Sequence, residues 1–323
     1  MPSMHPKPAK AAAKPTSAPA GAAAKPAQPV KPGAAAGYQA QRAEVRPKEQ
    51  GGGFFARLFG GGGAGGGSSG NIQSRELKAA IAGAKGNPDG ILRARQMIEE
   101  MGDRLPAAER SEAYRQLAAA PSYRNQRDNA QDPDTTCNFT SQAMAFEALG
   151  LNYHEAARGK QAEEQLYERF YAKGMGSRTD EKARLKLARD QGLQAEHIDT
   201  PAFSSAADAK QWFLSMALPR LQSGASATMG IQNGGFRHVV RVQWVQGDGI
   251  LTDDPWGSPV GNAQGEFGYS KLNDRGDGKK SLGKDQEGVG NDKVIPWATV
   301  AKIMSNRYVQ FYNASAAKLA QKR

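Results

Sequence analysis

The chain has 323 residues, a single cysteine and a formal net charge of +11 at neutral pH. One cysteine excludes an internal disulfide framework, so the fold does not depend on an oxidising compartment. The opening stretch MPSMHPKPAKAAAKP has no apolar core, and no run of about 18 apolar residues occurs, so we expect neither a signal peptide nor a transmembrane helix. We therefore expect synthesis in the cytoplasm, with any export through a dedicated secretion system or by lysis.

The first 70 residues differ in composition from the rest and carry +7 of the net charge. Residues 1–50 hold nine of the 18 prolines, among Ala and Lys, which predicts a disordered basic tail. Residues 51–70 contain eleven glycines and predict a flexible linker around the apolar stretch FFARLF. This stretch either docks onto a partner or a membrane surface, or folds back on its own domain. Because the excess charge lies in the tail, it does not indicate a nucleic-acid groove in the folded part.

Residues 71–120 are expected to form a small helical section. Ile, Leu, Met and Ala recur at helical spacing in SRELKAAIAG, GILRARQMIEEMGDRL and PAAERSEAYRQLAAA. This section either packs against the main domain or takes part in recognising substrate or masking the site.

The main domain is expected over residues 121–315, with a short tail at 316–323. Helical patterns come first, in CNFTSQAMAFEALG, EEQLYERFYAKG, EKARLKLARDQG and AADAKQWFLSMALPRLQSG. Strand patterns come second, in SATMGIQ, RHVVRVQWVQ, GILTDD and RYVQFYN. Helices placed before strands predict an α+β domain. Residues 271–293 form a Gly- and charge-rich loop, either a lid at the edge of the cleft or a tolerated surface insertion.

Cys137 opens the first helix of this domain. Asp134, Thr135 or Thr136 can cap that helix. Gly150 can end it. A cysteine in the first turn lies beside free N–H groups and the positive end of the helix dipole, which both favour a thiolate. An inert core thiol does not need that position, so we interpret Cys137 as a nucleophile.

A thiolate nucleophile needs a base, and the base needs a group that orients it. His238 begins a strand, and Asp254 ends the strand that returns after a Gly-Asp-Gly turn, so a hairpin can bring the two together. Asp253 is the alternative orienting residue. The Cys137 N–H and the side chain of Gln131, six residues upstream, are candidate donors to an oxyanion.

Gln131, Cys137, His238 and the Asp254-Pro255 pair, in this order and spacing, resemble a papain-superfamily cysteine peptidase. The pattern is most similar to the bacteriocin-leader (double-glycine) peptidases and their stand-alone bacterial and phage relatives, over residues 121–315. The stretch YRNQRDNAQDPDTTCNFTSQAM also resembles the opening segment of the stand-alone members, many of which are suspected wall-peptide hydrolases.

The resemblance implies a papain-like fold. It also implies a catalytic triad of Cys137, His238 and Asp254, with Gln131 beside the oxyanion. Asn138 stands where the leader peptidases usually have Gly, a departure that bears on leader processing more than on the chemistry.

Four further polar or aromatic residues were weighed as site candidates. His197 and Asp199 have a His-x-Asp spacing, but no tight cluster of further ligands accompanies them, so we expect no metal site. His154 is interpreted as a surface residue. Trp256 either forms a wall of the substrate cleft or belongs to the core. No P-loop or dinucleotide pattern occurs, and no cofactor is expected.

The sequence therefore predicts a cysteine peptidase or amidase. A basic tail, a linker and a small hydrolase suit a delivered antibacterial effector or lysin that cuts peptidoglycan stem peptides or cross-bridges. Its expected partners are a peptide or peptidoglycan substrate, a delivery apparatus bound through residues 1–70 and an immunity protein, without specific nucleic acid. The alternatives are a protease acting on a protein or leader peptide, and a catalytically idle papain-like module that binds peptides.

Overall fold

The computed structural model describes residues 72, 74–233, 236–256, 259–261, 267–269 and 290–321. The expected tail, the linker with its FFARLF stretch, and nearly all of the expected loop at 271–293 lie outside the described residues. The described chain combines helices with an antiparallel sheet, so the predicted α+β class is confirmed. None of its helices has the length and apolar character that a membrane crossing requires.

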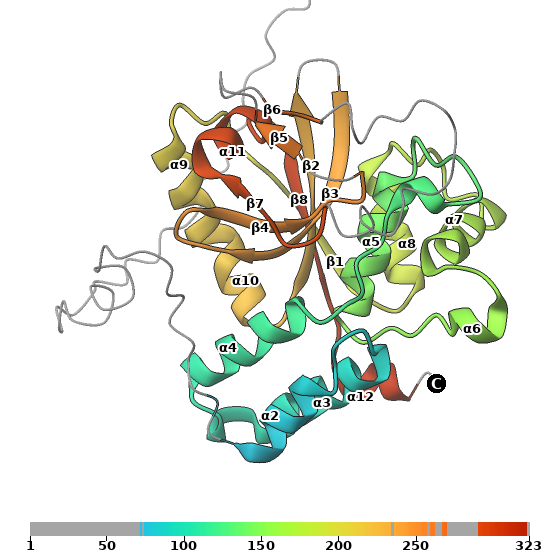
Figure 1. Ribbon diagram of the computed structural model, residues 1–323, viewed down its shortest axis with the longest axis vertical. Helices are drawn as coiled ribbons and strands as arrows, with labels where there is room; N and C mark the ends of the chain where they lie inside the picture. Colours follow the sequence, from blue (N-terminus) through green and yellow to red (C-terminus); the bar gives the residue numbers. More distant parts are fainter. Residues whose placement is uncertain are drawn as a thin grey trace, which may run out of the picture. The chain divides into compact units, whose positions relative to one another are not determined.

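A six-stranded antiparallel sheet lies at the centre of the described chain (Figure 1). In spatial order its strands are β1 (Gln194–Asp199), β8 (Tyr308–Asn313), β2 (Ser226–Asn233), β3 (Phe236–Val245), β4 (Gly249–Asp253) and β7 (Lys293–Pro296). A separate two-stranded sheet pairs β5 (Pro259–Gly261) with β6 (Phe267–Tyr269).

The four inner strands carry the β-branched and aromatic patterns that predict them, whereas the two edge strands, β1 and β7, do not. No residue of β1 is fully buried, and its sequence QAEHID is mostly polar. Pairing with β8 along all six residues holds β1 in place. An edge strand of this kind is hard to predict from its sequence, because its pairing with the neighbouring strand, and not an apolar pattern of its own, determines that it forms.

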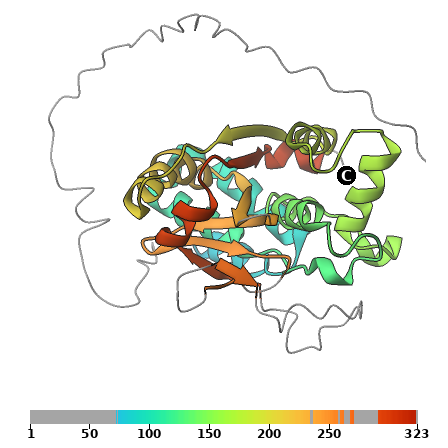
Figure 2. The ribbon, with the colours of Figure 1, turned by 90° about the horizontal axis from the view of Figure 1, so that it is seen from above.

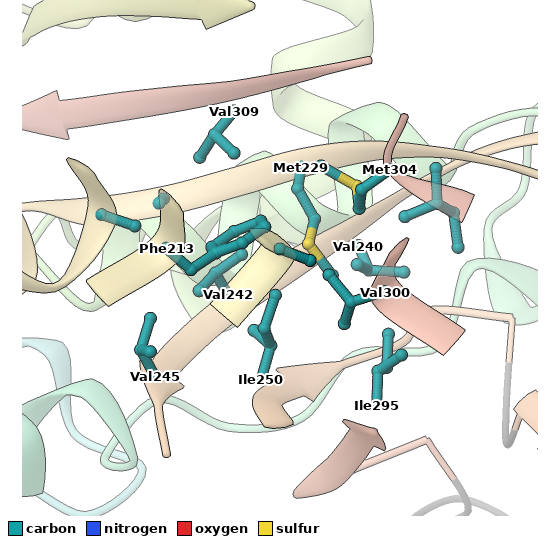
Figure 3. Close-up of a cluster of buried hydrophobic side chains, with 14 of the residues drawn as sticks. Phe213, Met229, Val240, Val242, Val245, Ile250, Ile295, Val300, Met304 and Val309 are labelled. Atoms are coloured by element: carbon teal, nitrogen blue, oxygen red, sulfur yellow. The ribbon is translucent and has the colours of Figure 1, made fainter. Parts of the chain in front are cut away.

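Helices cover both faces of the sheet, and each face has its own hydrophobic core. On one face lie α9 (Ala206–Trp212), a π-helical turn (Phe213–Ala217), α10 (Leu218–Gln222) and α11 (Trp297–Ile303). Figure 3 shows this core, in which Phe213 packs among Met229, Val240 and Val300. Along β2, Ala227, Met229 and Ile231 join this core, while the intervening Thr228 reaches the other face, as strand alternation requires.

The other core is built around α5 (Cys137–Glu147). It also contains α7 (Ala162–Ala172) and α8 (Glu181–Asp190), whereas the short α6 (Glu155–Arg158) contributes no buried residue. Every residue of α5 from Asn138 to Glu147 is buried, so this helix runs through the interior and not along the surface. Its path beside β3 is visible in Figure 2, where the green helix lies against the orange strands.

The N-terminal helices α2 (Arg75–Ala82), α3 (Pro88–Met101) and α4 (Ala107–Ala118) form a third core. This section joins the main domain through Leu92 of α3, which packs in the α5 core. The chain after residue 315, expected to be a tail, forms α12 (Ala316–Ala320) against α3. The backbone N–H of Ala316 donates to Glu99 Oε1 at 2.7 Å.

Candidate active site

The β3–β4 hairpin brings His238 and Asp254 together. The chain turns after β3, where the N–H of Gln246 donates to the carbonyl of Gly249 at 2.8 Å. His238 Nε2 then lies 2.8 Å from Asp254 Oδ1, although the two residues are 16 positions apart. Both are buried, with 3% and 0% of their surfaces exposed. The carboxylate therefore engages one ring nitrogen, which leaves Nδ1 for another partner.

Three backbone contacts hold Asp254 in place. Its Oδ1 accepts the N–H of Trp256 at 2.9 Å. Its own N–H donates to the carbonyl of Gly290 at 2.9 Å, and its carbonyl accepts the hydroxyl of Tyr123 at 2.7 Å. A Cβ on Gly290 would lie 2.0 Å from the carbonyl oxygen of Asp254, so only glycine allows this close approach.

Cys137 begins α5 and faces His238. Ser141, one turn further along α5, donates to the carbonyl of Val239 at 2.9 Å and so fixes the helix against β3. Burial alone would raise the pKa of the Cys137 thiol, but the charge and hydrogen bond of His238 outweigh burial and hold that pKa below its ordinary value. The thiol is half-buried, so a substrate can still reach it.

The pKa of His238 shifts in the opposite direction to the pKa of this thiol. Burial alone would lower the pKa of the imidazole, but Asp254 and then Cys137 raise it to about 10. A lowered thiol pKa together with a raised imidazole pKa favours transfer of the thiol proton to His238, which is the direction that activates a cysteine nucleophile.

The N-terminus of α5 has no side-chain cap. Thr136 occupies the N-cap position, but its side chain does not accept from the helix. Its Oγ1 instead accepts a hydrogen bond from Asn129 Nδ2 at 2.7 Å. Asp134 and Thr135, the other expected caps, precede the N-cap residue. Because no cap side chain takes them, the first N–H groups of the helix can act on the thiolate or on an oxyanion.

Gln131, the expected oxyanion donor, is exposed and makes no hydrogen bond to any other described residue. A different glutamine, Gln126, lies buried in the same segment. Its backbone N–H donates to the carbonyl of Pro255 at 2.9 Å, and its Nε2 donates to the carbonyl of Pro133 at 2.8 Å. Sequence reasoning did not select Gln126, because burial in an irregular segment leaves no local pattern.

Trp256 lies beside the imidazole and belongs to none of the three hydrophobic cores of the described chain. Its ring centroid is 6.4 Å from that of His238, with the two planes nearly perpendicular. The guanidinium of Arg127 stacks over the indole at 4.5 Å from the centroid. Trp256 therefore lies against one side of the imidazole, outside the three hydrophobic cores of the described chain.

Asp253, the alternative orienting residue, lies in a different cluster. Its Oδ2 is 2.6 Å from Arg241 Nη1, and its Oδ1 accepts from Gln243 Nε2 at 2.6 Å. The Arg241 guanidinium also donates to the carbonyl of Ala118. Asp253 thus has a structural ion pair, and Asp254 alone of these two neighbours reaches His238.

Asn138, the departure from glycine after the cysteine, holds a neighbouring loop. Its Nδ2 donates to the carbonyl of Arg178 at 3.0 Å, and Arg184 Nη1 donates to the same oxygen at 3.3 Å. Arg178 in turn donates to the carbonyl of Thr135, just before α5. A glycine at position 138 would remove one of the two donors that fix this loop beside the nucleophile.

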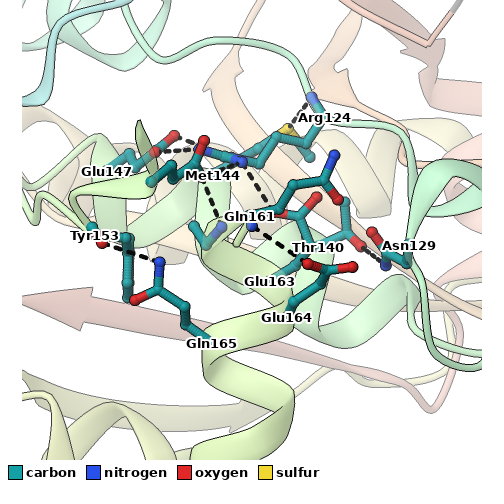
Figure 4. Close-up of polar contacts among 12 residues, drawn as sticks. Arg124, Asn129, Thr140, Met144, Glu147, Tyr153, Gln161, Glu163, Glu164 and Gln165 are labelled. Carbon is teal, nitrogen blue, oxygen red and sulfur yellow. Dashed lines mark hydrogen bonds and ion pairs between the residues drawn. The ribbon is translucent and has the colours of Figure 1, made fainter. Parts of the chain in front are cut away.

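A network around Arg124 anchors the segment before α5 (Figure 4). The guanidinium pairs with Glu147 of α5 and lies 2.9 Å from Glu163 Oε2 and 2.7 Å from Glu155 Oε1. Burial raises the pKa of Glu163 to about 7, even though Arg124 opposes the shift. This network ties the chain around Gln126 to the helices that carry the site.

The two other histidines in the described chain have different surroundings from His238. His154 is exposed, with a left-handed φ of +51°. His197 Nε2 lies 2.9 Å from Asp199 Oδ1 and 3.5 Å from Glu181 Oε2. The three side chains offer ligand atoms within 4.8 Å of one another and could hold a cation, but their short contacts already form a hydrogen-bonded ion-pair cluster. Sequence reasoning missed Glu181 because it comes from α8, distant in the sequence.

The comparisons with known proteins identify no relative of this chain. No protein-family model, curated protein or solved structure matches the chain.

Proposed function

We propose that this protein is a cysteine peptidase or amidase of papain-like fold, with Cys137, His238 and Asp254 as its catalytic residues. The observation that carries the proposal is the contact chain from Asp254 through His238 to a thiol at an uncapped helix N-terminus. A thiol kept only for packing needs no charged imidazole beside it. The same contact chain argues against an idle peptide-binding module.

The reaction would proceed in two steps. The Cys137 thiolate attacks the amide carbonyl carbon, and the negative charge that develops on oxygen is stabilised by the free N–H groups at the start of α5. The His238 imidazolium gives its proton to the leaving nitrogen, so the C–N bond breaks and a thioester remains. Water then attacks the thioester with His238 as the base, which releases a carboxylic acid and restores the thiolate.

The substrate class that we propose is the peptide part of peptidoglycan, either stem peptides or cross-bridges. In this proposal residues 1–70 serve delivery or docking, and an immunity protein protects the producing cell. The resemblance to stand-alone wall-peptide hydrolases supports this choice over leader processing, as does Asn138 in place of the glycine of leader peptidases.

The test compares wild-type protein with Cys137→Ala on purified sacculi, with products read by mass spectrometry. We expect new amine and carboxyl termini in the stem or cross-bridge with wild type and none with Cys137→Ala. The variant should unfold at nearly the wild-type temperature, because removing one sulfur costs little packing energy. Intact sacculi together with cleavage of proteins at defined sequences would favour the protease alternative. Equal activity of both proteins would exclude Cys137 as the nucleophile.

A further inference from the structure

Four arginines contact residues next to Cys137 and His238 or act on the thiol itself. Arg127 stacks on Trp256, Arg178 donates to the carbonyl of Thr135, Arg184 acts on the thiol, and Arg307 stacks on Tyr308. Arginines gathered around a nucleophile create a positive potential there, and guanidinium groups pair well with carboxylates.

Of these four arginines, Arg184 is the one whose charge is seen to lower the pKa of the Cys137 thiol. After His238, its guanidinium contributes to holding the pKa of Cys137 below the ordinary value. The side chain is 3% exposed and donates to the hydroxyl of Tyr308, while its Nε is buried without a hydrogen-bond partner in the described chain. A buried cation that is not neutralised by a carboxylate is costly unless an anion nearby benefits from it.

Two of the arginines, Arg178 and Arg307, are partly exposed. The Arg178 guanidinium binds the carbonyl of Thr135 at the start of α5. The Arg307 guanidinium stacks over the ring of Tyr308 at 5.7 Å, and burial together with nearby Glu181 and Cys137 raises the pKa of that phenol. Tyr308 therefore stays neutral and cancels none of the arginine charge.

Four of the carboxylates around the site have other partners. Asp132, before α5, accepts the hydroxyl of Tyr167 at 2.8 Å. Asp254 is engaged by the imidazole and by the N–H of Trp256. Glu181 faces His197 at 3.5 Å. Asp128 acts on Tyr123, and burial raises the pKa of the Asp128 carboxyl, which weakens it as a counter-charge.

We propose that this site selects peptides with a free carboxylate next to the scissile amide, with Arg178 and Arg307 as the specificity-determining residues. Arg127 and Arg184 add to the potential, but one is stacked on Trp256 and the other is buried. This inference rests on the proposed amide hydrolysis for its substrate, although the potential itself can be measured without any turnover.

The first experiment measures the potential at the sulfur. Full-length protein is alkylated at pH 7 with iodoacetate, which is anionic, or with iodoacetamide, which is neutral. Mass spectrometry follows the chain's single cysteine. The ratio of the two rates is compared with that of N-acetylcysteine. We expect a ratio at least about threefold higher in the protein, falling with added salt, because the added charges attract the anion.

Single substitutions show which arginines contribute to the positive potential at the sulfur. Arg178→Gln and Arg307→Gln should each lower the ratio by about twofold, the effect of one charge screened by water. Arg178→Lys should retain most of it, since it keeps the charge and changes the hydrogen bonds. Arg93→Gln, an exposed charge on α3, is the matched control and should change nothing. A wild-type ratio no higher than the reference, or equal ratios in Arg178→Gln and Arg178→Lys, would overturn the inference.

The second experiment uses paired peptides that carry either a carboxylate or a carboxamide on the residue beside the scissile bond. We expect kcat/KM to favour the carboxylate about tenfold or more, and Arg178→Gln with Arg307→Gln to remove most of that preference. Equal cleavage of both peptides, or a preference for the carboxamide, would contradict the inference. If neither peptide is cut under any condition, the proposed hydrolase function fails, while the alkylation ratio still decides whether the site attracts anions.

Discussion

Asp254 holds His238 with the same oxygen that accepts the backbone N–H of Trp256. The carboxylate is therefore fixed from the chain that follows it, and it cannot rotate away from the imidazole without losing the contact with Trp256. The two aspartates at the end of β4 consequently have separate tasks, since Asp253 faces Arg241.

Replacing these two aspartates should show which of them serves catalysis. Asp254→Asn should lower kcat roughly 10²- to 10⁴-fold, and it should also lower the unfolding temperature, because the buried imidazolium loses its carboxylate partner. Asp253→Asn should destabilise the fold by about 3 kcal/mol, because Arg241 loses a buried counter-charge, with little change in the kcat of the folded protein. Kinetics on folded protein and thermal melts measure both. Similar losses of kcat in the two variants would contradict this division.

The thiolate should depend on His238. In wild type, iodoacetamide should label Cys137 faster at pH 7 than it labels a free cysteine, because His238 holds the thiol pKa below its ordinary value. In His238→Gln the charge is lost and burial raises the thiol pKa, so labelling at pH 7 should slow at least about tenfold and require a pH above about 8.5. His154→Gln, at an exposed site, should behave like wild type. A low thiol pKa that persists in His238→Gln would mean that the helix terminus alone activates the sulfur.

The raised pKa of His238 should also make the free energy of unfolding depend on pH. Its folded pKa is raised to about 10, above the ordinary value of 6.5, so the folded state binds the extra proton more tightly. The resulting stabilisation is complete below about pH 6.5 and is lost as pH rises through about 10. Denaturant unfolding from pH 6 to pH 10 should show this loss in wild type and a smaller one in His238→Gln. Equal pH slopes in both proteins would count against the raised pKa.

The raised pKa of Glu163 should make the free energy of unfolding depend on pH in the acidic range. Its folded pKa is about 7, raised from 4.5, so the folded state binds more protons between these values and the unfolding free energy falls as pH rises from 4.5 to 7. The expected fall is on the order of 1–3 kcal/mol. Glu163→Gln should remove it, whereas Glu168→Gln, at a partly exposed position on α7 where the side chain pairs with Lys160, should not. An unchanged slope in Glu163→Gln would assign the dependence to other groups.

Gly290 should be required for the position of Asp254. A Cβ there would lie 2.0 Å from the Asp254 carbonyl oxygen and 2.5 Å from the Tyr123 hydroxyl. Gly290→Ala should therefore lower stability by about 2 kcal/mol or more and reduce kcat as Asp254 shifts. Gly247→Ala is the control, since no atom lies within 4 Å of its added Cβ. If Gly290→Ala retains wild-type kcat and unfolding temperature, the close approach is not needed for the site.

The sequence predicted the elements that carry the site better than the contacts around it. The patterns of β3 and β4 and the Gly-Asp-Gly turn placed His238 near Asp254, because a hairpin is a local structure. The hairpin register, which decides between Asp253 and Asp254, depends on a bulge between Val242 and Trp244 that no local pattern marks.

Contacts between segments that are far apart along the chain could not be predicted from the sequence. Arg184 meets Tyr308 across 124 positions, and Gln126 meets Pro255 only because two loops pack together. Gln131 was selected by spacing from the cysteine, but spacing in an irregular segment does not determine which side chain turns inward. The papain-like resemblance remains a proposal for the same reason, since it rests on few residues and their order.

The low pKa of the only cysteine has a consequence for how long the site survives. A thiolate is the form that peroxides oxidise, and a sulfenic acid is usually rescued by a second thiol nearby. This chain has no second thiol, so oxidised Cys137 can be restored only by a reductant from outside and otherwise advances to irreversible acids. The redox state of the compartment where the protein acts would thus limit its working lifetime.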